Sequence, residues 1–248
     1  MKGAAILLCH GTQHEGGRHE LTELSQLVGS RLDFPLWLGT LEFPGSDLPS
    51  VHQLWRQARG MQRLVIQPVL LFSGGHESLD LPWLVRQATE TVGCEVGCGA
   101  SFGTDPKLIG LAVDRVTDHL GPSDGDTDLL FVGRGSSHPV ALSQAAAVAA
   151  KVAGRTGLHH LVCHAGISQP DVASGLELAL ERHPRRLLVL PYLLHTGTLL
   201  ERVRQVAEEV APKSSVGVAV TTHIGNHPVL VEMLAGRIRS LLEGGSRV

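Results

Sequence analysis

The chain has 248 residues, of which 43% are hydrophobic and 18% charged, a composition that supports a substantial core and excludes a disordered protein. Its net charge of −3 and pI near 6.5 give no general attraction for nucleic acid or for an anionic membrane. Aromatic residues make up only 4% of the chain, too few for a base-stacking surface. An anionic ligand would therefore be held by individual arginines.

The cysteines form no recognisable redox or zinc motif. Cys94 and Cys98 are separated by three residues, whereas Cys9 and Cys163 fall in apolar runs typical of buried positions. The first expected strand begins almost at Met1, and no apolar run reaches membrane-spanning length. We therefore expect a reduced, cytoplasmic protein that binds neither membrane nor nucleic acid.

Short apolar runs alternate with longer amphipathic segments through the first half of the chain. This alternation predicts parallel strands joined by right-handed helical crossovers, with helices on both faces of the sheet. The expected strands are residues 4–9, 35–38, 64–72 and 95–97, and the expected helices are residues 19–32, 48–59, 79–91 and 106–119.

The same alternation restarts after residues 121–128, a polar segment that contains glycine and proline and is typical of a linker. The expected strands of the second half are residues 129–132, 160–163, 186–194 and 216–220, and its helices are residues 139–154, 170–181, 199–210 and 227–242. We therefore predict an α/β protein of two similar domains, residues 1–122 and 123–248. Each domain should contain a mainly parallel four-stranded sheet with helices on both faces.

Two sequence words recur in the second half, which indicates an internal duplication. Residues 6–12 (I-L-L-C-H-G-T) match residues 130–136 (L-F-V-G-R-G-S), an offset of 130 − 6 = 124. Residues 64–74 match residues 187–197 with an offset of 187 − 64 = 123, and both words carry a proline within a buried strand. We expect the two copies to face each other across a cleft.

The duplication provides an internal control for candidate site residues. His10, Glu42 and His76 follow the first three expected strands, whereas the second copy has Arg134, Gly166 and Leu199 at these places, the match of Glu42 with Gly166 being the loosest. Requirements of the fold should act on both copies alike. The asymmetry therefore favours a functional site in the first copy.

The three side chains have a common chemistry. Loops that follow parallel strands converge at the carboxyl edge of a sheet, where open α/β folds bind ligands. Two imidazoles and a carboxylate suit divalent first-row metals such as Co²⁺, Fe²⁺, Ni²⁺ or Zn²⁺, and they also accept protons. Taken singly, a local structural role is the favoured interpretation of each residue; the three together predict a site.

Other polar residues carry weaker signals. His14 and His138 occupy equivalent positions in the two copies, which favours a structural or helix-capping role as much as a metal site. His195 stands where the first copy has Phe72, so it is a candidate for the cleft. The remaining histidines without ligand spacing are expected mostly at the surface: His159, His160, His164, His183, His223 and His227.

Three motifs together resemble a known family. L-L-C-H-G-T near the start, L-E-F after the second strand and P-V-L-L-F-S-G-G-H-E-S-L-D-L-P are similar to the class II chelatases of modified tetrapyrroles, and more narrowly to sirohydrochlorin cobalt- and ferrochelatases. V-G-R-G-S-S and P-Y-L-L-H-T-G resemble the second half of the two-domain members. The resemblance covers essentially the whole chain.

The resemblance implies ATP-independent insertion of a divalent metal into sirohydrochlorin, for cobalamin or sirohaem. Co²⁺ is the first expectation and Fe²⁺ the second, with Ni²⁺ also compatible. The family's two histidines and its acidic residue correspond to His10, His76 and Glu42, which are expected to bind the metal and catalyse the reaction. The metal and the tetrapyrrole are substrates, and no permanently bound cofactor or oligomeric state beyond a monomer or weak homo-oligomer is expected.

Further residues are expected to bind the acid side chains of the macrocycle. Because sirohydrochlorin carries carboxylates, arginine and backbone N–H groups are suitable partners. These residues are Thr12, Ser73, Gly74, Gly75 and Arg134. The sequence departs from the family's Ser-Arg-Asp after His-Gly, since Thr12, Gln13 and His14 stand there.

Two other functions use the same residues. A non-catalytic metal or tetrapyrrole carrier would have the same cleft and ligands. A phosphohydrolase with His10 as nucleophile is disfavoured, because related His-Gly enzymes have an arginine before the histidine and this chain has Cys9.

Overall fold

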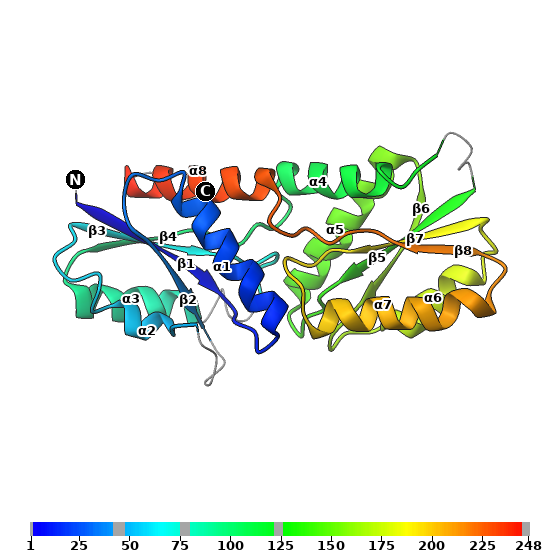
Figure 1. The fold of residues 1–248 in the computed structure, drawn as a ribbon, viewed down its shortest axis with the longest axis horizontal. Coiled ribbons are helices and arrows are strands. Elements are labelled where there is room, and N and C mark those ends of the chain that lie inside the picture. Colours follow the sequence, from blue (N-terminus) through cyan, green and yellow to red (C-terminus); the bar gives the residue numbers. More distant parts are fainter. Residues whose placement is uncertain (1, 42–47, 75–79, 122–125, 245–248) are drawn as a thin grey trace. The chain divides into compact units, whose positions relative to one another are not determined.

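The computed structural model describes residues 2–41, 48–74, 80–121 and 126–244. The chain divides into two compact units (Figure 1). Unit 1 comprises Met1–Phe102 and Asn226–Val248, and unit 2 comprises Gly103–Gly225. Each unit contains one four-stranded parallel sheet, as the alternation of the sequence predicted.

The sheet of unit 1 has the strand order β2-β1-β3-β4. Its strands are β1 (Gly3–Cys9), β2 (Leu36–Thr40), β3 (Arg63–Pro68) and β4 (Glu95–Cys98). Its helices are α1 (Glu15–Gly29), α2 (Val51–Leu54), α3 (Leu81–Val92) and α8 (Pro228–Leu242). Helices α2 and α3 cover one face of this sheet, and α1 and α8 cover the other (Figure 1).

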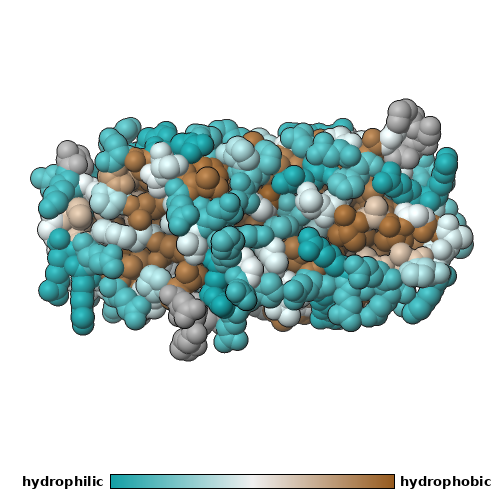
Figure 2. Space-filling view, viewed as in Figure 1, coloured by the Kyte–Doolittle hydropathy of each residue, from teal (hydrophilic) through white to brown (hydrophobic). Residues whose placement is uncertain are grey.

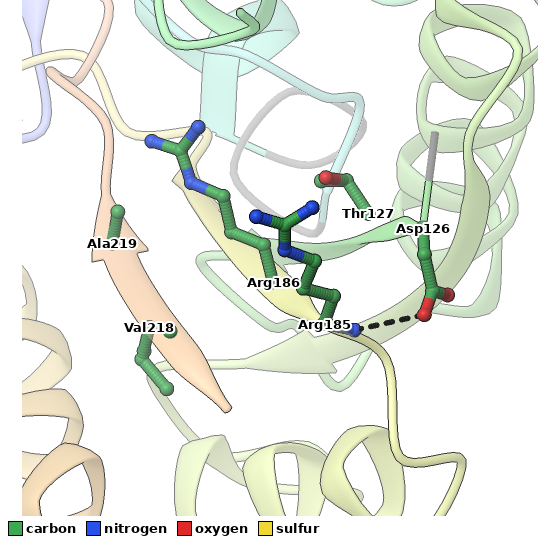
Figure 3. Close-up of a pocket in the computed structure, with 7 residues that line it drawn as sticks. Asp126, Thr127, Arg185, Arg186, Val218 and Ala219 are labelled. Carbon is green, nitrogen blue, oxygen red and sulfur yellow. Dashed lines mark hydrogen bonds between the residues drawn. The ribbon is translucent and has the colours of Figure 1, made fainter. Parts of the chain in front are cut away.

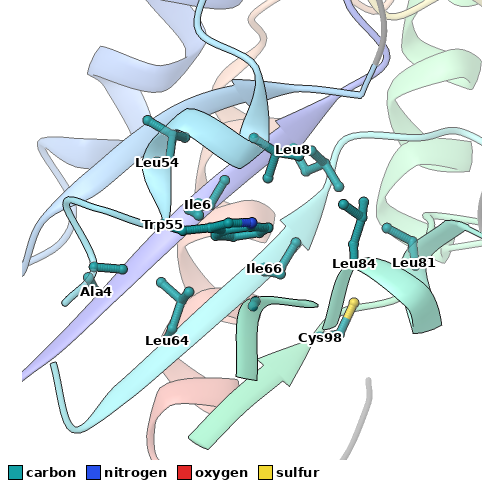
Figure 4. Packing of buried hydrophobic residues seen from close by; sticks show 13 residues of the cluster. Ala4, Ile6, Leu8, Leu54, Trp55, Leu64, Ile66, Leu81, Leu84 and Cys98 are labelled. Carbon is teal, nitrogen blue, oxygen red and sulfur yellow. The ribbon is translucent and has the colours of Figure 1, made fainter. Parts of the chain in front are cut away.

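Alternation along the central strands divides the core of unit 1 into two layers. Every residue of β1 is buried, as expected for a strand covered on both faces. Ile6 and Leu8 point towards α2 and α3, where they pack with Ile66 of β3 and Trp55 (Figure 4). The intervening residues of β1, such as Leu7, therefore face the α1 and α8 layer.

The sheet of unit 2 has the equivalent order β6-β5-β7-β8. Its strands are β5 (Thr127–Gly133), β6 (His159–His164), β7 (Arg186–Pro191) and β8 (Gly217–Val220). Its helices are α4 (Pro106–Thr117), α5 (Pro139–Thr156), α6 (Val172–Leu180) and α7 (Thr198–Val210), with a short 3₁₀ helix η2 (Ala211–Lys213) after α7. Leu130 and Val132 of β5 pack against α6 and α7, the same division of faces as in unit 1.

The last helix of each repeat belongs to the compact unit formed by the other repeat. Helix α4 follows β4 in the chain but is part of unit 2, and α8 follows β8 but packs on β3 and β1 of unit 1. The compact units therefore have different boundaries from the predicted sequence repeats, residues 1–122 and 123–248. The sheet of unit 1 therefore has one face covered in part by a helix from the far end of the chain, whereas unit 2 is one continuous stretch that begins with α4.

The duplication extends to individual hydrogen bonds. The Val69 amide donates to the Leu8 carbonyl at 2.8 Å, and the Tyr192 amide donates to the Val132 carbonyl at 2.9 Å. The residue before each of these amides is a proline, Pro68 or Pro191, which has no N–H to continue the ladder. Strands β3 and β7 therefore end at the prolines, several residues before the predicted ends, although the apolar sequence continues. The predicted second helix is also too long, because regular helix ends at Leu54.

Side chains at the helix starts explain where several helices begin. The Nδ1 atoms of His14 and His227 accept from the amides of Gly17 and Val229, both at 3.3 Å. His14 thus has the capping role considered from the sequence, and His227, which is half-buried, caps α8 in the same way. Carboxylates cap two other helices, Asp105 on α4 and Asp171 on α6.

The surface carries both polar and apolar residues. Polar side chains cover most of the face in Figure 2, and apolar residues show between them. None of the helices in the described part of the chain is long and apolar enough to cross a bilayer.

Candidate functional site at the carboxyl edge of the sheets

The end of β1 lies between the ends of β2 and β3 at the carboxyl edge of unit 1. Strand β2, which follows β1 in the chain, lies next to β1 on one side. Strand β3, which follows β2, lies next to β1 on the other side. The strand order therefore changes direction beside β1, which is where open α/β sheets bind ligands. His10 is the first residue after β1 and is half-buried.

The neighbouring strands end at the same level. Cys9 is paired with Thr40, and Leu8 is paired with Pro68. The amide of Leu41 donates to the Cys9 carbonyl at 2.9 Å, so the chain leaves β2 next to the start of the His10 loop. Glu42 itself lies outside the described residues.

Cys9 precedes His10 but does not share its chemistry. Its thiol is buried, and burial raises the pKa of Cys9 to about 12. A thiol with this pKa stays protonated near neutral pH, so it is neither a nucleophile nor an anionic metal ligand. Cys9 is a small core residue, as the apolar run predicted.

The turn after His10 is part of the shared scaffold. Gly11 has a φ of 98°, and its counterpart Gly135 has a φ of 85°, values that favour glycine. Thr12 Oγ1 accepts from the His14 amide at 3.1 Å, and Ser136 Oγ accepts in the same way from the amide two residues ahead at 3.0 Å. This contact gives Thr12 a structural role, whether or not it also contacts substrate.

The loop after β3 is described as far as Gly74. Ser73 and Gly74 are half-buried, and Ser73 Oγ is 3.0 Å from Ser101 Oγ in the segment that follows β4. Gly75 and His76 lie outside the described residues. Among the predicted metal ligands, only His10 is therefore placed. Within residues 2–41, 48–74, 80–121 and 126–244, no group of three His, Cys, Asp or Glu side chains could hold a metal ion.

Unit 1 contains a buried polar network that the sequence pattern did not indicate. Gln67 of β3 is fully buried, and its Nε2 donates to the carbonyls of Pro68 and Ala100 at 2.9 and 3.3 Å. Arg237 of α8 donates from Nη1 to the carbonyls of Ala100 and Ser101, both at 3.2 Å. The sequence signal for this network is a polar residue, Gln67, inside the apolar run R-L-V-I-Q-P. The second copy has Leu190 at the matching position.

The carboxyl edge of unit 2 has the same frame but different contents. Arg134 follows β5 directly and is exposed. The Gly166 amide donates to the Arg134 carbonyl at 2.9 Å, and a Cβ at position 166 would lie only 2.6 Å from that carbonyl oxygen. Unit 2 thus has no room for a side chain at the position that matches Glu42.

Two histidines lie at this edge of unit 2. His164, the last residue of β6, is buried, which corrects the expectation that it lies at the surface. Burial lowers the pKa of His164, so folding favours the neutral form of the ring. His195 is half-buried, and its Nδ1 is 2.9 Å from the Thr196 carbonyl oxygen.

A pocket lies at the opposite edge of the unit 2 sheet (Figure 3). Its lining comes from the amino ends of β5, β7 and β8 and the residues that precede them: Asp126, Thr127, Arg185, Arg186, Gly217, Val218 and Ala219. The Arg185 amide donates to the Asp126 carboxylate at 3.2 Å, which holds two connecting segments together. The pocket contains none of the predicted site residues.

Comparisons with known proteins agree with this architecture. The CbiX family model matches twice, over residues 4–119 and 128–241, once for each repeat. A sirohydrochlorin ferrochelatase of Priestia megaterium is 26% identical over 96% of this chain and 90% of its own length. A sirohydrochlorin cobaltochelatase of the same organism is 24% identical over 75% of this chain and 63% of its own length.

A solved structure has the same fold. The sirohydrochlorin chelatase SirB from Bacillus subtilis subspecies spizizenii, in complex with cobalt, superposes with a TM-score of 0.80 at 18% identity, over 98% of this chain and 96% of its own. The match is to an α/β protein of chelatase type, as the fold class predicted. The chain belongs to the CbiX family, and contains two copies of its unit. The resemblance drawn from the motifs is confirmed.

Proposed function

We propose that this protein inserts a divalent metal ion into sirohydrochlorin without ATP. The observation that carries the proposal is the family match over both repeats, combined with the placement of His10 at the switch point of unit 1. Curated relatives named as sirohydrochlorin ferro- and cobaltochelatases support the same reaction. For the metal we propose Co²⁺ first and Fe²⁺ second; the relatives include a ferrochelatase and a cobaltochelatase, which support both metals without ordering them.

The reaction exchanges two pyrrole protons for one metal ion. In our proposal His10 and His76 hold M²⁺ and accept the two protons as the metal passes to the ring nitrogens. Glu42 offsets the charge of the cation and relays protons to solvent. The metal and the macrocycle enter as substrates, and the metallated ring and two protons leave.

The macrocycle is proposed to be held through its carboxylates. Arg134 supplies a guanidinium that is exposed in unit 2. Thr12 and the Ser73–Gly74–Gly75 run supply hydroxyl and backbone N–H groups near the metal. These are neutral donors, so they orient the anion without cancelling the negative charge that Glu42 provides to the metal.

The test is a turnover assay with sirohydrochlorin in excess over protein and with Co²⁺, Fe²⁺ and Ni²⁺ in parallel. Metallation changes the absorbance of the ring, and the rate without protein is subtracted. We expect many turnovers per protein, fastest with Co²⁺. A single stoichiometric burst would instead identify a carrier, and faster turnover with Fe²⁺ would reverse the order of metals.

A further inference from the structure

Gln67 is an energetically unfavourable residue at its buried position in β3. It lies in β3 with no exposed surface, between the buried Ile66 and Pro68. Its Oε1 is buried and accepts no hydrogen bond within the described part of the chain. An amide buried with incomplete hydrogen bonding is less favourable than an apolar side chain of similar size. Stability of the sheet alone would therefore favour leucine here.

The surroundings are shaped to accept this amide. Gly99, directly after β4, faces Gln67, and a Cβ at position 99 would lie 2.2 Å from Gln67 Oε1. No L-residue fits there while the Gln67 side chain keeps its position. Gln67 and Gly99 are therefore a size-matched pair.

Unit 2 shows that the fold does not need this pair. The Gly99 amide donates to the Ile66 carbonyl, and the Thr221 amide donates to the Val189 carbonyl, both at 2.9 Å, so these two amides are equivalent. Unit 2 thus has Leu190 and Thr221 where unit 1 has Gln67 and Gly99. The same ladder forms with an apolar side chain and without the glycine.

The amide ties together the carboxyl ends of β3 and β4. Its Nε2 reaches the carbonyls of Pro68 and Ala100, and the Ala100 carbonyl also accepts from Arg237. The next residue, Ser101, is linked through its hydroxyl to Ser73 at 3.0 Å. Gln67 thus fixes the base from which the chain runs through Ser73 and Gly74 towards His76.

The arginine in this network is part of the scaffold, unlike Gln67. Arg237 on α8 corresponds to Arg115 on α4, which donates to the Ile224 carbonyl at 3.2 Å in unit 2. Both units therefore use an arginine to hold the segment after their last strand. Only unit 1 adds the buried amide, and unit 1 carries the predicted metal ligands.

We propose that Gln67 is a positioning residue for the metal-insertion reaction, with Gly99 as its required partner. This inference rests on the proposed function. Gln67 contacts no substrate; it holds the segment from Val69 to Gly74 relative to the segment after β4. Its loss should therefore displace this segment, which carries the proposed Ser73 and Gly74 donors and leads to His76, while Thr12 and Arg134 keep their places.

The test replaces the pair with the one that unit 2 uses, Gln67→Leu/Gly99→Thr, in the full-length protein. We expect a folded protein with a Tm at or above that of the wild type, because a buried unpaired carbonyl is removed. We expect kcat to fall roughly 10- to 100-fold, as displacement of reacting groups does. KM for sirohydrochlorin should rise by a smaller factor than kcat falls, because Thr12 and Arg134 still bind the macrocycle.

A second variant guards against an unforeseen packing defect. Gln67→Met keeps the length of the side chain and removes the amide, and Leu190→Met is the matched control in unit 2. We expect the loss of kcat in the first and wild-type kcat in the second. Wild-type kcat in Gln67→Met and in the double variant would overturn the inference, as would unfolding of both. A wild-type protein without turnover would contradict the proposed function itself, and the inference with it.

Discussion

The carboxyl edges of the two units share a frame and differ in what they hold. Both have a glycine of positive φ after the first strand, a hydroxyl-capped turn and a proline that ends the third strand. In unit 2 the loops after β5 and β6 close on each other: Ser168 Oγ both accepts from the Ser136 amide and donates to its carbonyl, each at 2.9 Å. Gly166 rests against the Arg134 carbonyl beside them.

This difference separates scaffold from function. What both copies keep, including Arg115 and Arg237, meets a requirement of the fold. What only unit 1 has, including His10 and the buried Gln67, is not needed to build the sheet. Duplication thus provides a test of necessity inside one chain, without any other sequence.

The two units can also be compared at the contact between an edge strand and the helix that covers it. Gly39 of β2 allows the close approach of Leu54 on α2, since a Cβ at position 39 would lie 2.9 Å from Leu54 Cδ1. In unit 2 the small residue is on the helix instead: a Cβ at Gly175 of α6 would lie 2.5 Å from the Cβ of Cys163 on β6. The two units fill equivalent contacts with the sizes reversed.

The largest effect should come from removing the helix that unit 1 receives from the end of the chain. A chain that stops after Gly225 lacks seven buried residues of α8: Leu230, Val231, Met233, Leu234, Ala235, Ile238 and Leu241. At about 1.5–3 kcal/mol for each of the six large side chains, the loss is as large as the roughly 5–15 kcal/mol that usually stabilises a domain. We expect unit 1 to unfold while unit 2 keeps its structure.

Limited proteolysis and amide hydrogen exchange would follow the two units separately. Protection should disappear from β1 and β3 and persist in β5 and β7. Protection retained in β1 would show that α8 is not an essential part of unit 1.

A smaller effect on stability is expected from changing the contact between Gly175 and Cys163 in unit 2. Gly175→Leu should destabilise unit 2 by about 1–3 kcal/mol, because its side chain overlaps Cys163. Cys163→Gly/Gly175→Leu reproduces the pairing of Gly39 with Leu54 and should recover most of the loss. Denaturant unfolding of the two single variants and the double variant gives the coupling energy. Strict additivity would contradict the proposed reversal of sizes.

The smallest effect concerns pH. Burial lowers the pKa of His164 in the folded state, so the unfolded chain binds a proton more readily. The contribution of neutral His164 to stability is full above the ordinary histidine pKa of about 6.5 and is lost as pH falls through the folded value. His164→Thr, which copies Thr40 of unit 1, should flatten the decrease in stability below pH about 6.5. An unchanged slope in denaturant unfolding from pH 5 to pH 8 would contradict this.

The strands and helices were predictable because apolar periodicity and turn residues are local signals. The ends of β3 and β7 could not be predicted in this way, because the apolar sequence continues after Pro68 and Pro191. The strands stop at these prolines because proline has no N–H to donate to the neighbouring strand. The exchange of α4 and α8 was hidden because a helix's apolar face does not specify which sheet it covers. Burial of His164 was not predicted for a similar reason, since a single polar residue at the end of a strand does not indicate which residues pack against it.

For the site, the sequence identified His10 through its place after a buried strand and through its replacement in the second copy. Gln67 escaped notice because one polar residue does not interrupt a strand pattern, and its partner Gly99 is distant in sequence. Glu42 and His76 rest on the sequence alone, since both lie outside the described residues. Their roles stay predictions.

The central claim is that the first repeat carries the chemistry and the second repeat the supporting frame. It is tested most directly by steady-state metal insertion with His10→Ala, His76→Ala and, as a control, His159→Ala at the amino edge of unit 2. The account predicts losses of at least about 10²-fold for the first two variants and a rate within about twofold of wild type for the control. Near wild-type rates for His10→Ala and His76→Ala would contradict it.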